Sequence, residues 1–465
     1  GAPELERYRK LLDRLVRSGA LPETGTERLH LDTTFVETQI LAFVTEDQEV
    51  ASVVEGDHVG VVLRQTPFYV ESGGQVTDTG IVAVYASDDL DVEPIAAIEV
   101  DDVRAPVGGL PIHWGEVVRG RLEVGQPVWA MVDYERRMDL ARNHTATHLL
   151  HSELRFTLGQ HVQQAGSQVT AERLRFDFTH SGMLTQEELT QVEQLVNEAI
   201  LADYPVDCEV KAYREAVDGG AMALFGEKYG DEVRVVSIGE GGNDFSKELC
   251  GGTHVERTSQ ISLFHIVSEG SVGAGVRRIE AVTGRAALNL VMERMRAVEG
   301  AATFLGTKPE EVDRRVLQLM ERVQALEKET TALQRQASTA RLAGALQSVV
   351  EVEGVKVLAT QVEATDVDAM REMTDYLRDR LETGVVILGA VIDQKPAFVA
   401  TVSKDLVERG LSASRLVKDV ARVVGGGGGG RDTMAQAGGK DPSKVAEALA
   451  SAAGLIESAL QSGKA

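Results

Sequence analysis

Two short motifs of histidine and cysteine constrain the fold of this chain more than any other feature. The first is His144-xxx-His148 and the second is Cys250-xxx-His254. On a helix, residues four apart lie on one face about one turn apart, so two imidazoles at this spacing can reach a single ion. Thiolate and imidazole form a borderline-soft donor set that suits Zn²⁺ better than Mg²⁺ or Ca²⁺. The spacing favours metal binding, and two unrelated pairs of core or surface residues are the alternative.

Other features of the sequence exclude several classes of site. HTATH lacks the glutamate of an HExxH metalloprotease helix. The sequence also lacks the H-x-E and PCxxC motifs that nucleobase deaminases combine. The glycine run Gly425–Gly430 is not followed by Gly-Lys-Ser/Thr, so it is not a P-loop. With only two cysteines a disulfide framework is excluded and a cytoplasmic location is favoured. Cys208 is expected to be a buried small hydrophobic residue.

The charge of the chain is strongly negative. It has 48 Lys+Arg against 72 Asp+Glu, a formal net charge of −24, which argues against indiscriminate coating of nucleic acid. Between Leu31 and Leu110 only two cations, Arg64 and Arg104, stand against sixteen acidic residues. This stretch is therefore a poor candidate for a phosphate-binding face.

The hydrophobic pattern predicts a multidomain α+β protein with five regions. Residues 1–30 predict a helix and a linker, and the short alternating runs of 31–130 predict a small β-barrel subdomain. Residues 131–300, which carry both metal motifs, mix helices and strands in an α/β core. A helical coiled-coil linker is predicted over 301–345 and an α/β C-terminal domain over 346–465.

Local signals place some helices more closely. The stretch from Asn143 to Leu158 predicts an amphipathic helix with Asn143 as its N-cap, and Thr185 with Glu188 predicts a capping box. Apolar or small residues at a 4-3-4-3 spacing predict the seam of a coiled coil or of a long helical hairpin, and the weak Thr and Ala positions favour a packed hairpin. The seam residues are Val312, Val316, Leu319, Val323, Leu326, Thr330, Leu333, Ala337 and Ala340.

Several segments resemble the editing domain of alanyl-tRNA synthetases. They are NHTATHLLH, ELCGGTH, FYVESGGQ at Phe68–Gln75, GGAMALFGEKYGDEVRVV at Gly219–Val236 and GVRRIEAVTG at Gly275–Gly284. The segment GGGGGGRDTMAQAGG resembles the C-terminal domain of the same family, which is shared with DHH-type phosphoesterases. Their order and spacing match the family over residues 31–465.

The resemblance implies the C-terminal part of an alanine–tRNA ligase, without its aminoacylation domain. ATP and Mg²⁺ would act only in that missing N-terminal domain. An alanine pocket cannot exclude glycine and rejects serine only weakly, so a second hydrolytic site is needed. The implied activity is that of an aminoacyl-tRNA deacylase, which hydrolyses the ester of mischarged Ser-tRNA(Ala) and Gly-tRNA(Ala). The implied partner is tRNA(Ala).

The resemblance also implies one zinc ion per chain, held by His144, His148, Cys250 and His254. Four protein ligands leave no open position, whereas catalytic zinc usually has three ligands and a water. Three possibilities follow: one ligand yields, the metal becomes five-coordinate, or zinc only anchors the α-amino group of the substrate.

Further pocket residues follow from the same resemblance. Gln164 would orient water or the serine hydroxyl, and Thr147 would contact that hydroxyl; a solvated loop and ordinary helix packing are the alternatives. Gly73, Gly74 and Gln75 would let the backbone approach the ester or the terminal ribose, unless they form a plain turn.

Contacts to tRNA are expected in two places. One of Arg277 and Arg278 would bind the phosphate of the 3′-terminal adenosine, and a surface salt bridge is the alternative for the other. The glycines Gly425–Gly430, close to a helix start and with Arg431 and Lys440 nearby, would cradle the tRNA backbone. A flexible linker is the alternative for these glycines.

Three other functions are alternatives. A DHH-type phosphoesterase needs an Asp-His-His metal motif, which this sequence lacks. A non-enzymatic scaffold for tRNA binding and dimerisation would use the same zinc as a structural ion. The editing domain of threonyl-tRNA synthetases shares the His/Cys pattern but not the coiled coil and C-terminal domain. A homodimer through those last two regions is expected.

Overall fold

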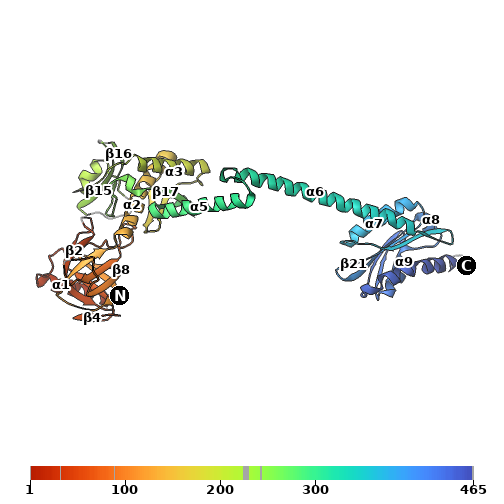
Figure 1. The fold of residues 1–465 in the computed structure, drawn as a ribbon, viewed down its shortest axis with the longest axis horizontal. Coiled ribbons are helices and arrows are strands. Elements are labelled where there is room, and N and C mark those ends of the chain that lie inside the picture. Colours follow the sequence, from red (N-terminus) through yellow and green to blue (C-terminus); the bar gives the residue numbers. More distant parts are fainter. Residues whose placement is uncertain (1, 32, 88, 224–229, 241–242, 463–465) are drawn as a thin grey trace. The chain divides into compact units, whose positions relative to one another are not determined.

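The computed structural model describes the chain except for residues 1, 32, 88, 224–229, 241–242 and 463–465. It divides into two compact units, Gly1–Ala301 and Ala302–Ala465 (Figure 1). Because residues 224–229 are not described, part of the motif at Gly219–Val236 lies outside the described residues. Among the described helices, none combines the length and the apolar character that crossing a membrane requires.

The first unit begins with a closed antiparallel β-barrel, drawn in red and orange in Figure 1. Since its last strand pairs back with its first, the six strands close on themselves, and the small β-barrel predicted from the alternating runs is confirmed. In spatial order the strands are β2 (Phe35–Val44), β5 (His58–Leu63), β9 (Leu110–Arg119), β8 (Ala96–Val107), β7 (Gly80–Val84) and β11 (Pro127–Val132).

Short elements complete the barrel. Helix α1 (Ala2–Arg17) packs its apolar face, with Tyr8, Leu11 and Leu15, against the outside of the strands. The short strands are β1 (Glu27–Arg28) paired with β6 (Gln65–Thr66), β4 (Ser52–Val54) paired with β10 (Arg121–Glu123), and β3 (Glu49–Val50) at the end of β2.

Helix α2 (Tyr134–Leu158) follows the barrel and forms the centre of the first unit. Its N-cap is Asp133, whose side chain accepts a hydrogen bond from the main-chain nitrogen of Arg136. The prediction that Asn143 caps this helix is wrong. Asn143 is buried inside the helix, where its amide donates to the carbonyl of Thr170 and accepts from the hydroxyl of Thr283. Asn143 looks like a boundary in the sequence because it is a polar residue within the core.

Two sheets and three helices make up the rest of the first unit. The four-stranded sheet has the order β12 (Gln164–Val169), β13 (Leu174–Thr179), β18 (Val276–Thr283), β17 (Phe264–Gly273). The three-stranded sheet has the order β14 (Val206–Ala212), β15 (Glu232–Glu240), β16 (Asn243–Leu249). The helices are α3 (Gln186–Leu201), α4 (Tyr213–Asp218) and α5 (Gly284–Leu305), with the 3₁₀ turn η1 (Thr258–Ile261) before β17.

Two local predictions have opposite outcomes here. The capping box of Thr185 and Glu188 at the start of α3 is confirmed, since both of its hydrogen bonds are present. The expected burial of Cys208 is wrong, because its side chain is exposed. Cys208 belongs to β14, which lies at the edge of its sheet.

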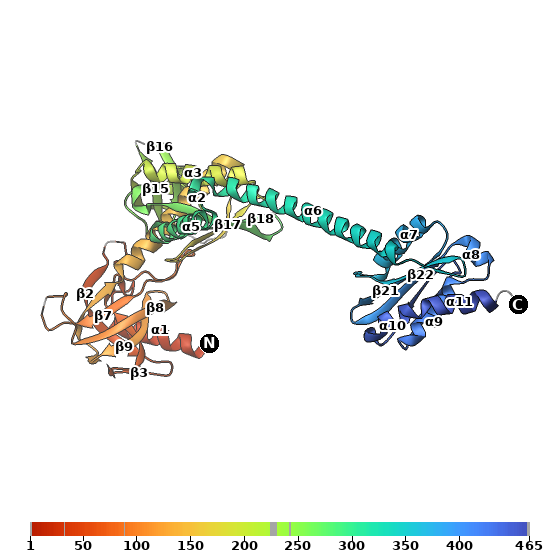
Figure 2. The same cartoon turned by 45° about the vertical axis from the view of Figure 1, so that its right-hand side comes forward.

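The second unit is a six-stranded sheet between two layers of helices (Figure 2). Alternate residues of β21 explain the layers: Val385 and Ile387 enter one core cluster, while Val386 and Leu388 enter the other. In spatial order the strands are β19 (Val350–Val352), β20 (Val355–Gln361), β21 (Val385–Ile392), β22 (Lys395–Val402), β24 (Met434–Gly438) and β23 (Gly427–Gly430). The helices are α7 (Val367–Leu381), α8 (Lys404–Glu408), α9 (Ala413–Val423), α10 (Val445–Ala450) and α11 (Ala452–Ser462).

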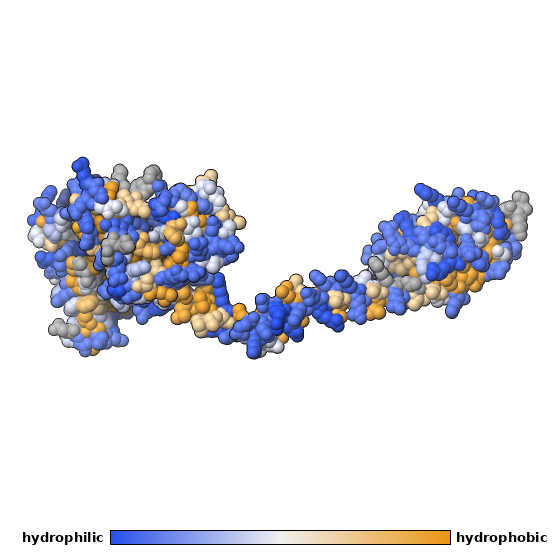
Figure 3. Space-filling model, turned by 90° about the horizontal axis from the view of Figure 1, so that it is seen from above, coloured by the Kyte–Doolittle hydropathy of each residue, from blue (hydrophilic) through white to orange (hydrophobic). Residues whose placement is uncertain are grey.

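The second unit also contains the long helix α6 (Val312–Ala345). Most of its predicted seam is exposed: Val316, Leu319, Val323, Leu326 and Leu333 each keep 40–57% of their surface. Figure 3 shows orange hydrophobic patches between blue hydrophilic ones along the long helix. The helix is confirmed, whereas a coiled-coil partner for it stays a prediction.

Candidate metal centre

The two motifs meet at one point beside helix α2. His144 and His148 lie one turn apart on α2, and Cys250 and His254 lie in the loop after β16. Each of the four offers one ligand atom, and these atoms all lie within 4.8 Å of one another. The Sγ of Cys250 is 3.2 Å from Nε2 of His144 and 3.4 Å from Nε2 of His254. The four residues named by the resemblance therefore form a single cluster that can hold a metal ion.

Hydrogen bonds to the Nδ1 atoms orient all three imidazoles. Nδ1 of His144 lies 2.7 Å from Oε1 of Gln75, and Nδ1 of His148 lies 3.2 Å from a carboxylate oxygen of Glu248. Nδ1 of His254 lies 3.1 Å from the hydroxyl of Thr145.

The direction of these bonds leaves each Nε2 free for the ion. A carboxylate accepts, and the Thr145 hydroxyl already donates to the carbonyl of Ala141, so the histidine Nδ1 atoms are the donors. In a neutral imidazole the lone pair then resides on Nε2, the atom that points into the cluster. The buried Nε2 of His148 has no hydrogen-bond partner among the described residues, which fits a metal ligand.

Charge inside the cluster favours the thiolate of Cys250 but also a proton on His148. Burial opposes ionisation of His148, yet Glu248 and Cys250 raise its pKa to about 10, so an ion has to compete with a proton at this ring. Burial alone would raise the pKa of the Cys250 thiol, but the nearby rings of His144 and His254 hold it well below its usual range. The group is then a thiolate, which is the form that binds zinc. Burial likewise opposes ionisation of Glu248, yet His148 and His151 hold the pKa of this carboxyl below its usual range. Glu248 is therefore a buried carboxylate.

Glu248 is a functional candidate that the sequence pattern does not single out. Its two oxygens lie 3.2 Å from Nδ1 of His148 and 3.3 Å from Nδ1 of His151, and one accepts from the hydroxyl of Ser246 at 3.0 Å. A carboxylate behind a ligating histidine fixes the ring and raises its basicity. In the sequence Glu248 is simply the residue before Leu249 and Cys250, and no spacing rule connects this glutamate to α2.

The segment Gly73–Gln75 joins the barrel to this cluster. Gln75 is fully buried and contacts both His144 and Thr253. A Cβ on Gly74 would lie 2.5 Å from the carbonyl oxygen of Ser167 on β12, whereas a Cβ on Gly73 would meet open space. The structure thus gives Gly74 and Gln75 partners within the protein, although Gly74 is exposed like Gly73.

Gln164 and Thr147 both lie near these elements. Gln164 begins β12 and is half-buried, and its amide donates to the hydroxyl of Ser167 at 3.3 Å. Thr147 precedes His148 on α2, and its buried hydroxyl donates to the carbonyl of Asn143 at 2.8 Å. The Thr147 oxygen can still accept a hydrogen bond from a substrate hydroxyl.

The arginine pair on β18 is bonded to carboxylates. Nε of Arg277 lies 2.5 Å from Glu269, and Arg278 makes two hydrogen bonds to Asp177, at 2.6 and 2.8 Å. A phosphate at either arginine would have to share or replace these partners. In the structure both arginines form salt bridges.

The glycine run has a different structure from the one expected. Gly427–Gly430 is the edge strand β23, paired antiparallel with β24, and it follows the end of helix α9. The glycines thus form a strand, with Gly429 beside Ser414 near the start of α9, and their contact with tRNA stays a prediction. Arg431 and Lys440 are both exposed, and the register places them at opposite ends of this hairpin.

A pocket of about 290 Å³ reaches the cluster from one side. His254 and Thr253 line it from the loop after β16, which we call the metal loop, and Arg234 lines it from β15. His30 and Tyr134 contribute from the barrel side and from the start of α2. Neither Gln164 nor Thr147 is among the described residues that line it.

Three family models match the chain. Residues 9–136 match the model described as tRNA synthetases class II (A), residues 233–280 match the threonyl and alanyl tRNA synthetase second additional domain, and residues 354–458 match the DHHA1 domain. The second match contains Cys250 and His254, and the first contains the segment Gly73–Gln75. The alanine–tRNA ligase of Pelotomaculum thermopropionicum is 48% identical over 423 residues, which is 91% of this chain and 47% of the relative.

The chain belongs to the alanyl-tRNA synthetase family. The alanine–tRNA ligase of Chloroflexus aurantiacus is 44% identical over 93% of the chain and 48% of its own length. The chain thus spans about half the length of the curated relatives it matches. The crystal structure of the C-Ala domain of Aquifex aeolicus alanyl-tRNA synthetase is 30% identical and covers 24% of this chain and 98% of its own. Its TM-score of 0.23 is too low to establish a shared fold.

Proposed function

We propose that the first unit is a zinc-dependent deacylase that hydrolyses mischarged Ser-tRNA(Ala) and Gly-tRNA(Ala). The observation that supports this best is the cluster of His144, His148, Cys250 and His254, whose three rings already present Nε2 toward one point. A bound zinc ion would polarise the ester carbonyl or hold the α-amino group of the substrate. The chain's own residues bind, orient and select the substrate.

The proposed selection for serine rests on hydroxyl and amide groups near α2. The oxygen of Thr147 can accept from a serine hydroxyl, and the amide of Gln164 can orient that hydroxyl or a water. The pocket beside His254 gives the aminoacyl end one path to the cluster, and Thr147 and Gln164 would act from outside its described lining. Replacing Gln164 with His should therefore change the ratio of Ser-, Gly- and Ala-tRNA(Ala) deacylation more than it changes tRNA affinity.

The decisive experiment is deacylation of Ser-, Gly- and Ala-tRNA(Ala) by the chain with and without a chelator. We expect zinc-dependent loss of the serine and glycine esters and slower loss of the alanine ester. Cys250→Ala should lower zinc content and abolish serine editing, whereas Cys208→Ala, at an exposed position on β14, should change neither. Stoichiometric zinc with no deacylation would contradict the proposal.

One observation favours a second candidate, a tRNA-binding and dimerising scaffold with structural zinc. The cluster has four protein ligands, and closed four-ligand sites are typical of structural zinc. A homodimer through α6 and the C-terminal domain belongs to both candidates, because the α6 seam is exposed. The same deacylation assay separates them, since a scaffold retains zinc and tRNA binding without turnover.

We further propose that the second unit binds tRNA(Ala) through the β23–β24 hairpin. Arg431 and Lys440 are exposed at its two ends, and no ion pair involves either of them within the described ranges. Arg431→Glu and Lys440→Glu should each weaken tRNA binding and reduce its salt dependence. Lys356→Glu, an equal charge change at an exposed position on β20, is the control. Equal effects of all three variants would show that only net charge matters.

A further inference from the structure

We propose that Gln75 is a positioning residue of the metal centre, through which the β-barrel holds the ring of His144 and the loop of His254 in register for the ion. The inference rests on the metal site of the proposed function. It differs from that function because it assigns a role to a barrel residue that is not a ligand.

The orientation of the Gln75 amide is determined by its neighbours. The main-chain N–H of Thr253 points to Oε1 at 3.0 Å, and Nε2 donates to the hydroxyl of Thr253 at 2.9 Å. Because a main-chain N–H can only donate, the atom facing it must be the amide oxygen. The same oxygen lies 2.7 Å from Nδ1 of His144, so that ring must donate from Nδ1 and present its lone pair on Nε2.

Gln75 therefore connects two segments that are far from it in the sequence. His144 lies 69 residues later on α2, and Thr253 lies 178 residues later, next to the ligand His254. The side chain is fully buried, so water does not compete for these bonds. One amide sets the distance between a ligand on a helix and a ligand on a loop.

The main chain around Gln75 is fastened as well. Val76 donates to the carbonyl of Val169 at 3.1 Å, and Val169 donates to the carbonyl of Gly74 at 2.7 Å. These bonds attach the segment to β12. The amide of Gln75 thus projects from a supported backbone and not from a free loop.

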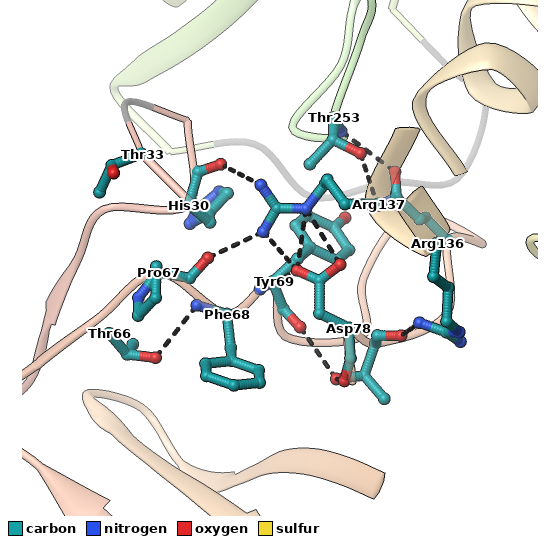
Figure 4. A network of polar contacts seen from close by, with 12 residues as sticks. His30, Thr33, Thr66, Pro67, Phe68, Tyr69, Asp78, Arg136, Arg137 and Thr253 are labelled. Atoms are coloured by element: carbon teal, nitrogen blue, oxygen red, sulfur yellow. Dashed lines mark hydrogen bonds and ion pairs between the residues drawn. The ribbon is translucent and has the colours of Figure 1, made fainter. Parts of the chain in front are cut away.

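A buried ion pair clamps the same barrel segment to α2 (Figure 4). Nε of Arg137 lies 3.0 Å from both oxygens of Asp78, and the two Nη atoms donate to the carbonyls of His30 at 2.9 Å and Pro67 at 2.8 Å. The main-chain nitrogen of Tyr69 donates to Asp78 at 2.7 Å.

The ion pair of Arg137 and the hydrogen bond of Gln75 act on the same face of α2. Arg137 and His144 are seven residues apart on α2, which is two turns, so their side chains point the same way. Their partners Asp78 and Gln75 are three residues apart in the barrel segment. The barrel therefore contacts α2 at two successive points, and the second is a metal ligand.

The test is the zinc affinity of the whole chain, measured by competition with a chromophoric chelator in the absence of tRNA. Gln75→Leu should bind zinc about 10- to 100-fold more weakly, the usual effect of losing a partner behind a ligand. Gln75→Glu keeps an oxygen for His144 and for the Thr253 N–H, so it should bind zinc more tightly than Gln75→Leu. The control is Gln39→Leu, which removes a barrel glutamine whose amide donates, among the described residues, to the carbonyl of Gly125 alone.

Two outcomes would overturn the inference. The first is that the Gln75→Leu chain folds and binds zinc as tightly as the Gln39→Leu control. The second is that the parent chain binds no zinc, which would also remove the metal site of the proposed function. Zinc binding without deacylation would contradict only the proposed function. If Gln75→Leu does not fold, Thr253→Val, which removes the acceptor of the Gln75 amide, replaces it. It must then weaken zinc binding more than Thr33→Val, which removes an exposed hydroxyl.

Discussion

Gly252 lies against the imidazole of His144 so closely that a Cβ on this glycine would stand 2.0 Å from the ring's Cε1. It would also stand 2.2 Å from Nδ1, the atom that donates to Gln75. The backbone of the metal loop therefore forms one wall of the pocket that holds this ring. The neighbouring Gly251 has no atom within 4 Å of its Cβ direction.

This contrast predicts different outcomes for two adjacent alanine variants. Gly252→Ala should displace His144, weaken zinc binding and lower the free energy of unfolding by about 1–3 kcal/mol, as overpacking of a buried site does. Gly251→Ala should stay within about 0.5 kcal/mol of the parent and keep its zinc affinity. Chelator competition and denaturant unfolding measure both. Similar effects in the two variants would show that loop flexibility, and not contact with His144, explains the glycines.

The barrel and the metal cluster were accessible to sequence reasoning for definite reasons. An alternating apolar pattern indicates a strand that is buried on one face, and six such strands form the barrel. The spacing of His144 and His148 reports one helix face directly. Their meeting with Cys250 and His254 could be expected only from the family resemblance, since no pattern in the chain relates the two motifs.

Other features could not be read from the sequence because they depend on distant contacts. Gln75 follows two glycines, which suggests a turn or a ligand-binding loop, yet its partners lie 69 and 178 residues away. Asn143 resembled a helix cap because α2 is buried around most of its length, and an inward polar residue interrupts the apolar pattern. The glycines of β23 carry no side-chain period, so their pairing with β24 had no sequence signal.

The buried ion pair between Arg137 and Asp78 should contribute strongly to the stability of the first unit. Asp78 is fully buried and Arg137 nearly so, so removing one charge leaves the other uncompensated. Asp78→Asn should lower the free energy of unfolding by about 3–5 kcal/mol. Asp102→Asn, which breaks the exposed pair with Arg104, should cost at most about 1 kcal/mol. Equal losses of unfolding free energy in the two variants would show that the buried pair of Arg137 and Asp78 does not stabilise the first unit.

The glycine strand of the second unit is predicted to tolerate substitution at alternate positions. A Cβ on Gly428 would lie 2.2 Å from the carbonyl oxygen of Gln436 and 2.4 Å from the Cβ of Ala437, whereas Gly427 faces open space. Gly428→Ala should therefore detach β23 from β24 and expose amides of the hairpin to hydrogen exchange. Gly427→Ala should leave their exchange rates unchanged. Equal exchange in the two variants would argue that β23 is not paired as described.

The last prediction concerns His113 in the barrel core. Its ring is fully buried, with Nδ1 donating to the carbonyl of Val61 at 3.0 Å and Nε2 accepting from the hydroxyl of Thr66 at 2.7 Å. Burial lowers the pKa of His113 from 6.5 to about 4, although the bond to Val61 opposes this shift. The folded chain therefore keeps the ring neutral at pH values where the unfolded chain protonates it.

Between about pH 6.5 and pH 4 the unfolded state binds more protons at this position, so His113 makes the chain less stable as the pH falls. A shift of this size corresponds to about 3 kcal/mol of unfolding free energy once the pH is near the lower value. His113→Asn removes the titrating ring, so its unfolding free energy should fall less steeply over the same range, whatever its stability at neutral pH. Denaturant unfolding at several pH values measures the difference between the two curves. Parallel curves for parent and variant would mean that His113 is not a neutral histidine of the barrel core.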